Sequence, residues 1–260
     1  MSNIRQAFQN GKAFIPFITC GDPDIESTKR NVRAAVAAGA DLVELGIPFS
    51  DPTAEGPVIQ AANLRALSGG VTTDAVFQMV AELREELTTP LVFMTYANVV
   101  FSYGIARFAA RAAEVGIDGI ILPDVPFEEK EEFAPAFRAA GIDFISMIAP
   151  TSMARIREIA AAAEGFLYVV SSLGVTGVRQ EINTDLSGML ASVRQANPSL
   201  PAAIGFGIST PAQAKRMAAV ADGVIVGSAI VRIMAEKGRE ADEEIARYVR
   251  EMKTAANTFQ

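Results

Sequence analysis

The stretch Val115-Gly116-Ile117-Asp118-Gly119-Ile120-Ile121-Leu122 contains the pattern that decides the fold. An alanine-rich helical segment ends just before Gly116, and a glycine at that place is typical of a helix C-cap, where a left-handed conformation costs glycine little. A short, continuously apolar run follows, as expected of a strand that is buried on both faces. The stretch therefore predicts a junction between a helix and a buried strand.

The same junction recurs along the chain. Ala38-Gly39-Ala40-Asp41 and Ala140-Gly141-Ile142-Asp143 repeat it, and Val220-Ala221-Asp222 is a weaker copy. The interval of 77 residues from the first glycine to Gly116 is about three times the 25 residues from Gly116 to Gly141. Spacing of this kind indicates a strand–helix unit that is repeated at near-constant length.

Eight apolar runs alternate with helical patterns. The predicted strands are Phe14–Ile18, Leu42–Gly46, Leu91–Thr95, Gly119–Leu122, Phe144–Ile148, Leu167–Val170, Ala202–Gly205 and Gly223–Val226. The predicted helices are Ile25–Ala38, Thr73–Leu87, Ile105–Val115, Glu128–Ala140, Ala154–Ala163, Leu186–Ala196, Pro211–Ala219 and Glu240–Ala255, with a short extra helix around Ile4–Asn10. This pattern predicts an α/β fold, a (β/α)8 TIM barrel, as a single domain over residues 1–260. A doubly wound open sheet is the alternative, although no G-x-G-x-x-G follows the first strand.

Composition narrows the possible functions. The chain has 260 residues, one cysteine and no histidine, which excludes a Ser-His-Asp triad and a Cys-His pair and argues against a metal site. A net charge of −7 without a basic block argues against nucleic acid as a partner. Neither a signal-peptide core nor a run long enough to span a bilayer is present in the sequence, so we expect a cytoplasmic protein with no membrane partner.

Glu44 is the most informative residue outside the repeat. It is the lone carboxylate within the run Leu42-Val43-Glu44-Leu45-Gly46, where side chains alternate between the two faces of the strand. If both faces are buried, this carboxylate is costly unless it is hydrogen-bonded, paired or protonated. Glu55 follows in the next loop. Two acids that flank a loop beyond the strand end predict an acid/base site, with a structural ion pair between Glu44 and a nearby Lys or Arg as the alternative.

Glycine-bearing loops follow the last two predicted strands, at Gly205-Phe206-Gly207-Ile208-Ser209 and at Gly227-Ser228-Ala229-Ile230. In barrels of this kind the active site lies at the carboxyl ends of the strands, and these two loops with a short helix form a phosphate site. Glycines allow backbone N–H groups to approach a phosphate, and a helix N-terminus adds partial positive charge. We therefore predict phosphate binding here, with ordinary tight turns as the alternative.

Other residues near the predicted strand ends complete the candidate site. Tyr168 is expected to enter the barrel beside Glu44, although a core tyrosine is the alternative. Phe17, Tyr96 and Phe206 are candidates for the wall of an apolar pocket, or belong simply to the core. Two long loops are predicted to act as lids or binding loops, Phe49–Gly70 and Ser171–Asp185.

These motifs, in this combination and order, resemble a known family. Over essentially its whole length the chain is similar to the α subunit of tryptophan synthase. The resemblance is carried by Pro16-Phe17-Ile18-Thr19-Cys20-Gly21-Asp22-Pro23, Glu44-Leu45-Gly46-Ile47-Pro48-Phe49-Ser50-Asp51-Pro52, Gly56-Pro57-Val58-Ile59-Gln60, Tyr96-Ala97-Asn98, Asp124-Val125-Pro126, Gly174-Val175-Thr176-Gly177, Gly205-Phe206-Gly207-Ile208-Ser209 and Gly227-Ser228-Ala229-Ile230-Val231.

The resemblance implies a lyase that cleaves indole-3-glycerol phosphate to indole and glyceraldehyde 3-phosphate without a metal or organic cofactor in this subunit. It implies that Glu44 protonates indole C3 and helps to deprotonate the glycerol hydroxyl, and that Tyr168 is an active-site tyrosine. It assigns phosphate contacts to Gly177, Phe206, Gly207, Gly227 and Ser228, indole contacts to Phe17 and Tyr96, and a further substrate contact to Thr176.

The chain departs from the family pattern at its second acid. The family has an aspartate in a Leu-Ala-Asp-Gly-Pro stretch, which receives or polarises the indole N–H, whereas this chain has Thr53-Ala54-Glu55-Gly56-Pro57. We expect Glu55 to take that role with one additional methylene. The alternative is a solvated loop glutamate, with Asp51 or no residue in its place.

The resemblance also implies a partner, a β subunit that carries pyridoxal phosphate and takes the indole, in an α2β2 complex. Two rival interpretations stay open from the sequence. One is a stand-alone indole-3-glycerol phosphate lyase, which would turn over fully without a partner. The other is a non-catalytic, phosphate-binding barrel that acts as a regulatory subunit.

Overall fold

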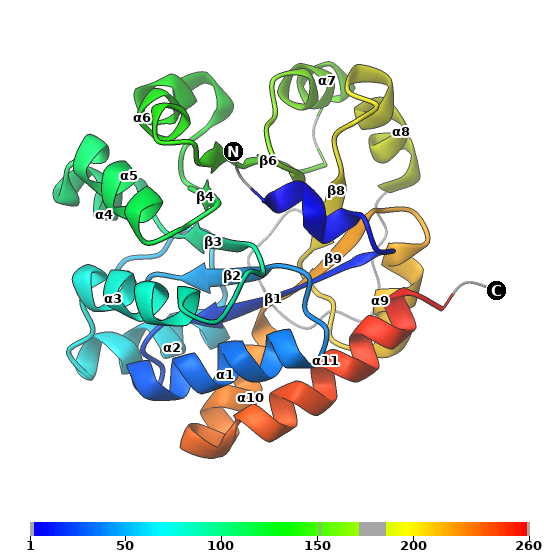
Figure 1. Cartoon of the computed structure of the whole chain (residues 1–260). Helices are drawn as coiled ribbons and strands as arrows, with labels where there is room; N and C mark the ends of the chain where they lie inside the picture. The colour runs from blue at the N-terminus through cyan, green and yellow to red at the C-terminus, as the bar shows by residue number, and fades with distance from the viewer. Residues whose placement is uncertain (1–2, 151, 172–185, 259–260) are drawn as a thin grey trace.

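Short parallel strands form one sheet that is closed almost completely into a barrel (Figure 1). The computed structural model describes residues 3–150, 152–171 and 186–258. Within these residues the sheet order is β5-β4-β3-β2-β1-β9-β8-β7-β6, and every pair is parallel. The strands are β1 (Ala13–Thr19), β2 (Val43–Gly46), β3 (Leu91–Met94), β4 (Gly119–Ile121), β5 (Asp143–Phe144), β6 (Ser146–Ile148), β7 (Leu167–Val170), β8 (Ala202–Gly205) and β9 (Gly223–Val226).

The two ends of this order belong to a single predicted strand. The predicted strand Phe144–Ile148 is divided at Ile145 into β5, which pairs with β4, and β6, which pairs with β7. One extended segment therefore serves both of its neighbours, and the nine observed strands correspond to the eight predicted ones. The predicted (β/α)8 barrel is confirmed, and the open doubly wound sheet is wrong.

Helices surround the barrel (Figure 1). They are α1 (Ile25–Ala37), α2 (Pro57–Ser68), α3 (Thr73–Arg84), α4 (Ala97–Tyr103), α5 (Ile105–Glu114), α6 (Ala134–Ala139), α7 (Met153–Ala161), α8 (Leu186–Ala196), α9 (Pro211–Ala218), α10 (Ser228–Lys237) and α11 (Asp242–Ala256), with 3-10 helices η1 (Ile4–Phe8), η2 (Phe127–Glu132) and η3 (Gly238–Glu240). Among the described residues, no helix has both the length and the apolar character that a membrane span requires.

Two of the sequence predictions need correction. The predicted loop Phe49–Gly70 contains α2, which begins at Pro57 after the N-cap residue Gly56. Proline suits the first turn of a helix, because the N–H that it lacks would have no partner there. The predicted helix Glu128–Ala140 is divided into η2 and α6, and Pro135 lies in the first turn of α6, where the same argument applies.

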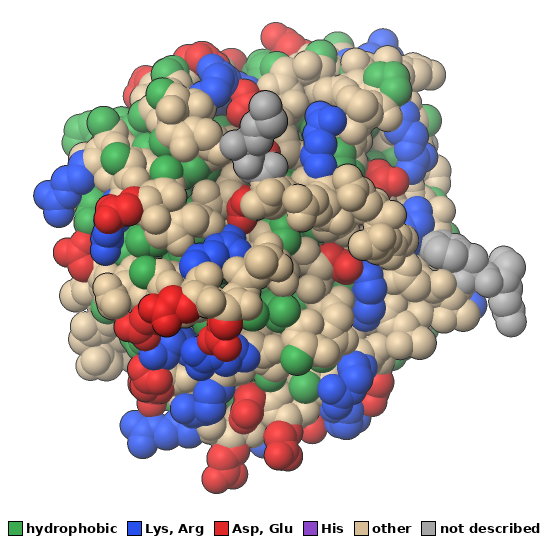
Figure 2. All heavy atoms as spheres, viewed as in Figure 1, with side chains coloured by type: hydrophobic (Ala, Val, Ile, Leu, Met, Phe, Trp, Pro, Cys, Tyr) green, Lys and Arg blue, Asp and Glu red, His purple; other side chains and the backbone are tan. Residues whose placement is uncertain are grey.

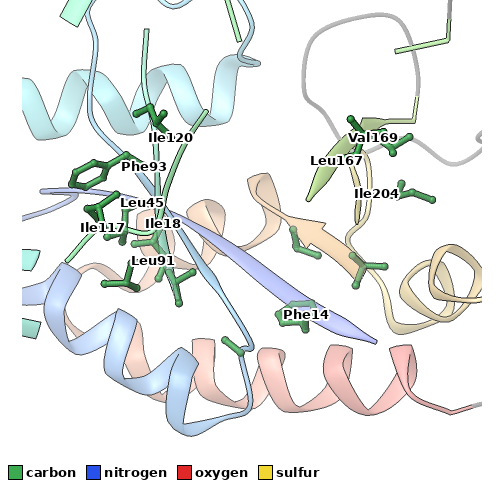
Figure 3. Close-up of a cluster of buried hydrophobic side chains, with 14 of the residues drawn as sticks. Phe14, Ile18, Leu45, Leu91, Phe93, Ile117, Ile120, Leu167, Val169 and Ile204 are labelled. Atoms are coloured by element: carbon green, nitrogen blue, oxygen red, sulfur yellow. The ribbon is translucent and has the colours of Figure 1, made fainter. Parts of the chain in front are cut away.

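Apolar side chains pack on both sides of the sheet. The outward-facing cluster lies between the strands and the surrounding helices, and Figure 3 labels Phe14, Ile18, Leu45, Phe93 and Ile120 from it. A second cluster fills the barrel and includes Ile15, Phe17, Leu42, Val92, Ile121, Tyr168, Ala203 and Ile225. Alternation along each strand thus supplies two cores, one on each side of the sheet.

The N-terminal segment closes one end of the barrel. The predicted short helix is present as η1, and its residues Ile4 and Ala7 belong to the interior cluster. Gly119 at the start of β4 provides the space, because a Cβ at this position would lie 2.8 Å from Ile4 Cδ1. In Figure 1, the blue N-terminal helix lies across the barrel end that faces the viewer.

The aspartates of the repeated junction have a structural role at this same end. The Oδ2 atoms of Asp41, Asp118 and Asp222 accept hydrogen bonds from the backbone N–H groups of Phe14 (2.7 Å), Leu91 (3.0 Å) and Ala202 (3.0 Å), respectively. Each aspartate thereby satisfies a donor at or next to the start of the neighbouring strand. The repeat in the sequence therefore reflects a hydrogen bond that is repeated around the barrel.

Acidic and basic side chains lie side by side over α1 and α3 (Figure 2). Lys29 on α1 contacts Glu82 on α3 at 2.6 Å, and Arg33 contacts Glu86 at 2.6 Å. Arg33 and Glu86 are both substantially exposed, so their pair adds little stability.

Candidate active site

A pocket opens at the carboxyl ends of the strands, opposite the end that η1 closes. Eight of the predicted site residues line it, and they come from β1, β2, β7 and three loops. These residues are Phe17, Glu44, Glu55, Tyr168, Phe206, Gly207, Gly227 and Ser228.

Glu44 lies inside the barrel at the base of this pocket. Strand β2 places it beside Phe17 of β1 and Val92 of β3 in the register of the sheet. It is 1% exposed, and neither carboxylate oxygen has a hydrogen-bond partner among the described residues. Burial, together with the nearby charge of Glu55, raises the pKa of Glu44 to about 8. Among residues 3–150, 152–171 and 186–258, no Lys or Arg pairs with Glu44, and its raised pKa leaves it largely protonated at neutral pH.

Glu55 faces the same pocket in a more polar setting. It is 6% exposed, and its Oε2 accepts a hydrogen bond from Asn63 Nδ2 at 2.7 Å. Burial raises the pKa of Glu55 to about 7, while hydrogen bonds from the side chains of Asn63 and Tyr96 oppose that rise. The two buried acids thus differ in their surroundings, as acid/base pairs commonly do.

Tyr168 enters the barrel from β7, as predicted. It is 5% exposed, and burial together with the nearby charge of Glu44 raises the pKa of its hydroxyl well above the usual range. Gly205 on the adjacent strand makes room for it, because a Cβ there would lie 2.5 Å from the tyrosine hydroxyl oxygen. Tyr168 is therefore a neutral hydroxyl in the pocket wall, able to donate a hydrogen bond but not to ionise near neutral pH.

The loop after β8 has an unusual backbone. Phe206 and Gly207 both have φ of +75°, and Phe206 is the one non-glycine residue with a positive φ in the described chain. Such a conformation persists only where its surroundings hold it. Ser171 Oγ donates a 2.8 Å hydrogen bond to the carbonyl oxygen of Phe206, and the Phe206 ring packs edge-on against Tyr168 at 6.1 Å. The strained turn shapes the pocket mouth next to Gly207.

The loop after β9 presents a helix N-terminus to the same mouth. Gly227 is the N-cap residue of α10, and Ser228 is its first residue. The first N–H groups of a helix have no partner within the helix, and their partial positive charge attracts anions. A Cβ at Gly227 would lie 3.6 Å from Phe17 Cβ and Ile59 Cδ1, which is ordinary contact distance. The protein alone therefore leaves space for a side chain here.

Three predicted residues are not placed in the pocket wall. Tyr96 is 2% exposed and lies behind Glu55, where its hydroxyl oxygen accepts a 3.2 Å hydrogen bond from Ala54 N and its ring stacks on Phe49. Tyr96 is not among the residues that line the pocket, and its predicted contact with indole stays a prediction. Thr176 and Gly177 lie outside the described residues.

Asp51, the alternative second acid, is exposed and does not line the pocket. Its Oδ2 accepts a hydrogen bond from the neighbouring hydroxyl of Ser50. Glu55 is therefore the acid that the fold brings to Glu44. The alternative of a solvated glutamate at position 55 is wrong, because α2 covers this side chain.

Sequence reasoning missed several residues of the site. The apolar wall also contains Ile59, Met94, Ile208 and Ile225, and Asn63 holds Glu55 from α2. Asn63 was missed because the sequence predicted a loop over Phe49–Gly70, in which nothing connects this residue with Glu55. Within residues 3–150, 152–171 and 186–258, no cluster of three His, Cys, Asp or Glu side chains is arranged as metal ligands.

A parallel (β/α)8 barrel whose mouth combines two buried acids, a glycine turn and a helix N-terminus defines a barrel enzyme that works by acid/base chemistry on an anionic substrate. The model of one protein family, tryptophan synthase alpha chain, matches residues 2–259. The chain belongs to that family.

Individual relatives agree with the family model. The chain is 48% identical over 257 residues to the tryptophan synthase alpha chain of Lacticaseibacillus casei, covering 99% of this chain and 96% of the relative. It is 51% identical over 256 residues to that of Lactiplantibacillus plantarum, covering 98% and 96%. A chain in the tryptophan synthase structure from Mycobacterium tuberculosis superimposes with a TM-score of 0.89 at 31% identity, covering 99% of each chain.

A chain of the tryptophan synthase complex from Pyrococcus furiosus superimposes with a TM-score of 0.85 at 37% identity, covering 94% of this chain and 99% of that one. As a member of this family, the chain is a carbon–carbon lyase of tryptophan biosynthesis that cleaves indole-3-glycerol phosphate. The predicted family and activity are confirmed, and a purely regulatory barrel is wrong.

Proposed function

We propose that Glu44 and Glu55 divide the acid/base chemistry of this cleavage between them. The observation that carries the proposal is that both acids are buried in one pocket, yet within the described residues only Glu55 has hydrogen-bond donors on its carboxylate. A buried acid without such donors retains its proton near neutral pH, whereas one that accepts hydrogen bonds ionises more readily. Glu44 is therefore the proton donor and Glu55 the carboxylate.

Glu44 both donates and receives a proton during the reaction, so it ends the cycle protonated as it began. Protonated Glu44 gives its proton to indole C3, and positive charge develops at the ring nitrogen, where the Glu55 carboxylate stabilises it. The bond from C3 to the glycerol carbon then breaks, and its electron pair returns the ring to neutral indole. The hydroxyl proton on that carbon passes to Glu44, the aldehyde forms, and Glu44 is protonated again. Only protons move between the chain and the substrate, so the proposal requires no cofactor in this subunit.

We assign the phosphate end of the substrate to Gly207, Gly227 and Ser228. Support comes from the helix N-terminus at Ser228 and from the strained turn at Phe206 and Gly207, which lie at one pocket mouth. Backbone N–H groups and a serine hydroxyl bind phosphate without a cationic side chain. The predicted contacts from Thr176 and Gly177 stay predictions, and indole then occupies the apolar part of the pocket near Phe17 and Ile225.

We further propose that the chain works with a pyridoxal-phosphate β subunit in an α2β2 complex in the cytoplasm. Support comes from the similar Pyrococcus furiosus protein, which is described as part of a tryptophan synthase a2b2 complex and is 36% identical to this chain. We expect the β subunit to contact the loop-rich face formed by residues 48–57 and 173–179, of which the second segment lies outside the described residues.

The test is indole release from indole-3-glycerol phosphate by the purified chain, alone and across a concentration series of the cognate β subunit. We expect cleavage by the chain alone, a rise in rate on mixing, and co-elution of the two proteins. Full turnover by the chain alone, with neither activation nor co-elution, would instead identify a stand-alone lyase.

A further inference from the structure

Helix α2 folds back over Glu55 and contacts it twice. Gln60 Nε2 donates a 2.8 Å hydrogen bond to the backbone carbonyl oxygen of Glu55, and Asn63 Nδ2 donates a 2.7 Å bond to its carboxylate. Asn63 is 3% exposed, so this bond between an amide and a carboxylate is shielded from water. Bonds to charged acceptors in such surroundings are stronger than bonds between neutral groups.

The helix that carries Asn63 is itself fixed. Arg65 donates hydrogen bonds to both carboxylate oxygens of Asp22, at 2.8 and 2.7 Å, and Asp22 is 1% exposed. Ile59 and Ala62, which precede Asn63 on the same helix, pack into the interior cluster of the barrel. Asn63 is therefore held in place from two sides, which makes it a rigid support for the acid.

We propose that Asn63 is a positioning residue that fixes the orientation of the Glu55 carboxylate toward the substrate and keeps this acid ionised. The inference rests on the proposed role of Glu55. A carboxylate offers about four acceptor positions, of which Asn63 takes one and leaves others for the substrate N–H. A neutral amide suits this task, because a Lys or Arg in its place would neutralise the charge that has to stabilise the ring nitrogen.

The electrostatic surroundings of Glu55 support the same role. Glu44 from β2 and Tyr96 beyond β3 also face it, and Asp124 influences Tyr96. Burial is the largest influence on the pKa of Glu55 and raises it to about 7, while the hydrogen bonds from Asn63 and Tyr96 lower it. Removal of the Asn63 donor therefore raises this pKa further, and a smaller fraction of Glu55 is ionised at neutral pH.

The first experiment replaces the amide by an apolar group of similar size. In Asn63→Leu, assayed with an excess of cognate β subunit, we expect kcat to fall about tenfold or more at pH 7 with KM changed less than about twofold. The acidic limb of the kcat/KM profile should move upward by about one pH unit. The matched control is Asn31→Leu, which changes an equally buried helical asparagine (2% exposed) on α1. In this control variant the acidic limb of the kcat/KM profile should stay at its wild-type pH.

The second experiment exchanges one methylene between the two partners. Glu55→Asp shortens the acid and Asn63→Gln lengthens the amide, so each single variant should lose activity by misplacing the carboxylate. The double variant restores the combined length, and we expect it to be at least about fivefold more active than the product of the single effects predicts. This rescue does not require the leucine variant to fold.

The outcomes separate the two proposals. The positioning role of Asn63 would be overturned if the acidic limb of the kcat/KM profile of Asn63→Leu stayed at its wild-type pH. It would also be overturned if the effects of Glu55→Asp and Asn63→Gln were simply additive in the double variant. If either occurs while Glu55→Gln is inactive, Glu55 keeps its proposed function and only the inference about Asn63 fails. Normal turnover by Glu55→Gln would overturn the role of Glu55 itself.

Discussion

The two ends of the barrel use buried acids in opposite ways. At the end closed by η1, Asp118 accepts hydrogen bonds from Leu91 N and contacts Arg84 at 2.7 Å. At the open end, Glu44 has no hydrogen-bond partner in the described part of the chain, and its pKa is raised to about 8. An acid whose charge is satisfied stabilises the fold, whereas an acid without partners is held in a high-energy surrounding and is available for chemistry.

The largest effect should come from the acid without partners. Glu44→Gln keeps the size of the side chain but replaces the carboxylic acid with an amide that cannot donate the proton. We therefore expect kcat to fall by about a hundredfold or more. The barrel should still fold and bind a non-cleavable substrate analogue, because Glu44 makes no hydrogen bond that the fold needs. Steady-state kinetics with circular dichroism check this. Cleavage close to the wild-type rate would exclude Glu44 as the proton donor.

At the closed end of the barrel, we expect a substitution to reduce stability and to leave activity unchanged. Asp118→Asn removes the charge that Arg84 contacts, and both side chains are largely buried (7% and 17% exposed). We expect a loss of about 2 to 4 kcal/mol in the free energy of unfolding, with kcat/KM unchanged in the folded protein. Urea denaturation measures this. Asp222→Asn is the control, because its side chain is 37% exposed and its ion pair is 4.0 Å long, and it should cost well under half as much.

Glu55 is intermediate between these two cases, because it is buried at the open end but accepts hydrogen bonds. Glu55→Gln should reduce kcat about tenfold to a hundredfold by removing the charge at the ring nitrogen. Glu55→Asp keeps the charge and should retain more activity than Glu55→Gln. Asp51→Asn should change kcat little, since the Asp51 side chain is exposed. A normal Glu55→Gln enzyme with an inactive Asp51→Asn enzyme would reverse the assignment.

The smallest effect concerns the phosphate end of the pocket. In Gly227→Val the new Cβ lies at ordinary contact distance from Phe17 and Ile59, and we expect the side chain to occupy the space that a phosphate needs. We expect KM to rise about tenfold while the melting temperature changes little. A substrate analogue soaked into crystals provides an independent check, and a phosphate bound away from Gly207, Gly227 and Ser228 would refute the site.

The sequence predicts the barrel better than the details of its mouth. The repeated Gly-x-Asp junctions revealed a strand–helix unit, and the eight apolar runs that alternate with helical patterns allowed the units to be counted without the structure. The interruption of the fifth strand at Ile145 depends on barrel closure, which no local pattern contains. Buried acids could be recognised as well, because Glu44 stands alone in an apolar run.

The support around Glu55 could not be predicted in the same way. Helix α2 begins within a segment rich in Gly and Pro, which favoured a loop. Without that helix, nothing connects Asn63 with an acid eight residues earlier. Tyr96 was placed at the pocket because it follows a strand, yet it contacts Ala54 and is not among the residues that line the pocket.

The protonation state of Glu44 tests the central claim most directly. Because burial raises its pKa above that of an unfolded chain, the protonated acid adds stability that is complete below about pH 4.5 and is lost as the pH rises through about 8. Infrared difference spectra between the wild-type protein and Glu44→Gln would follow the carboxylic acid carbonyl of this one residue from pH 4 to 10. We predict a buried acid that ionises near pH 8. A carboxylate already ionised by pH 6 would contradict the account.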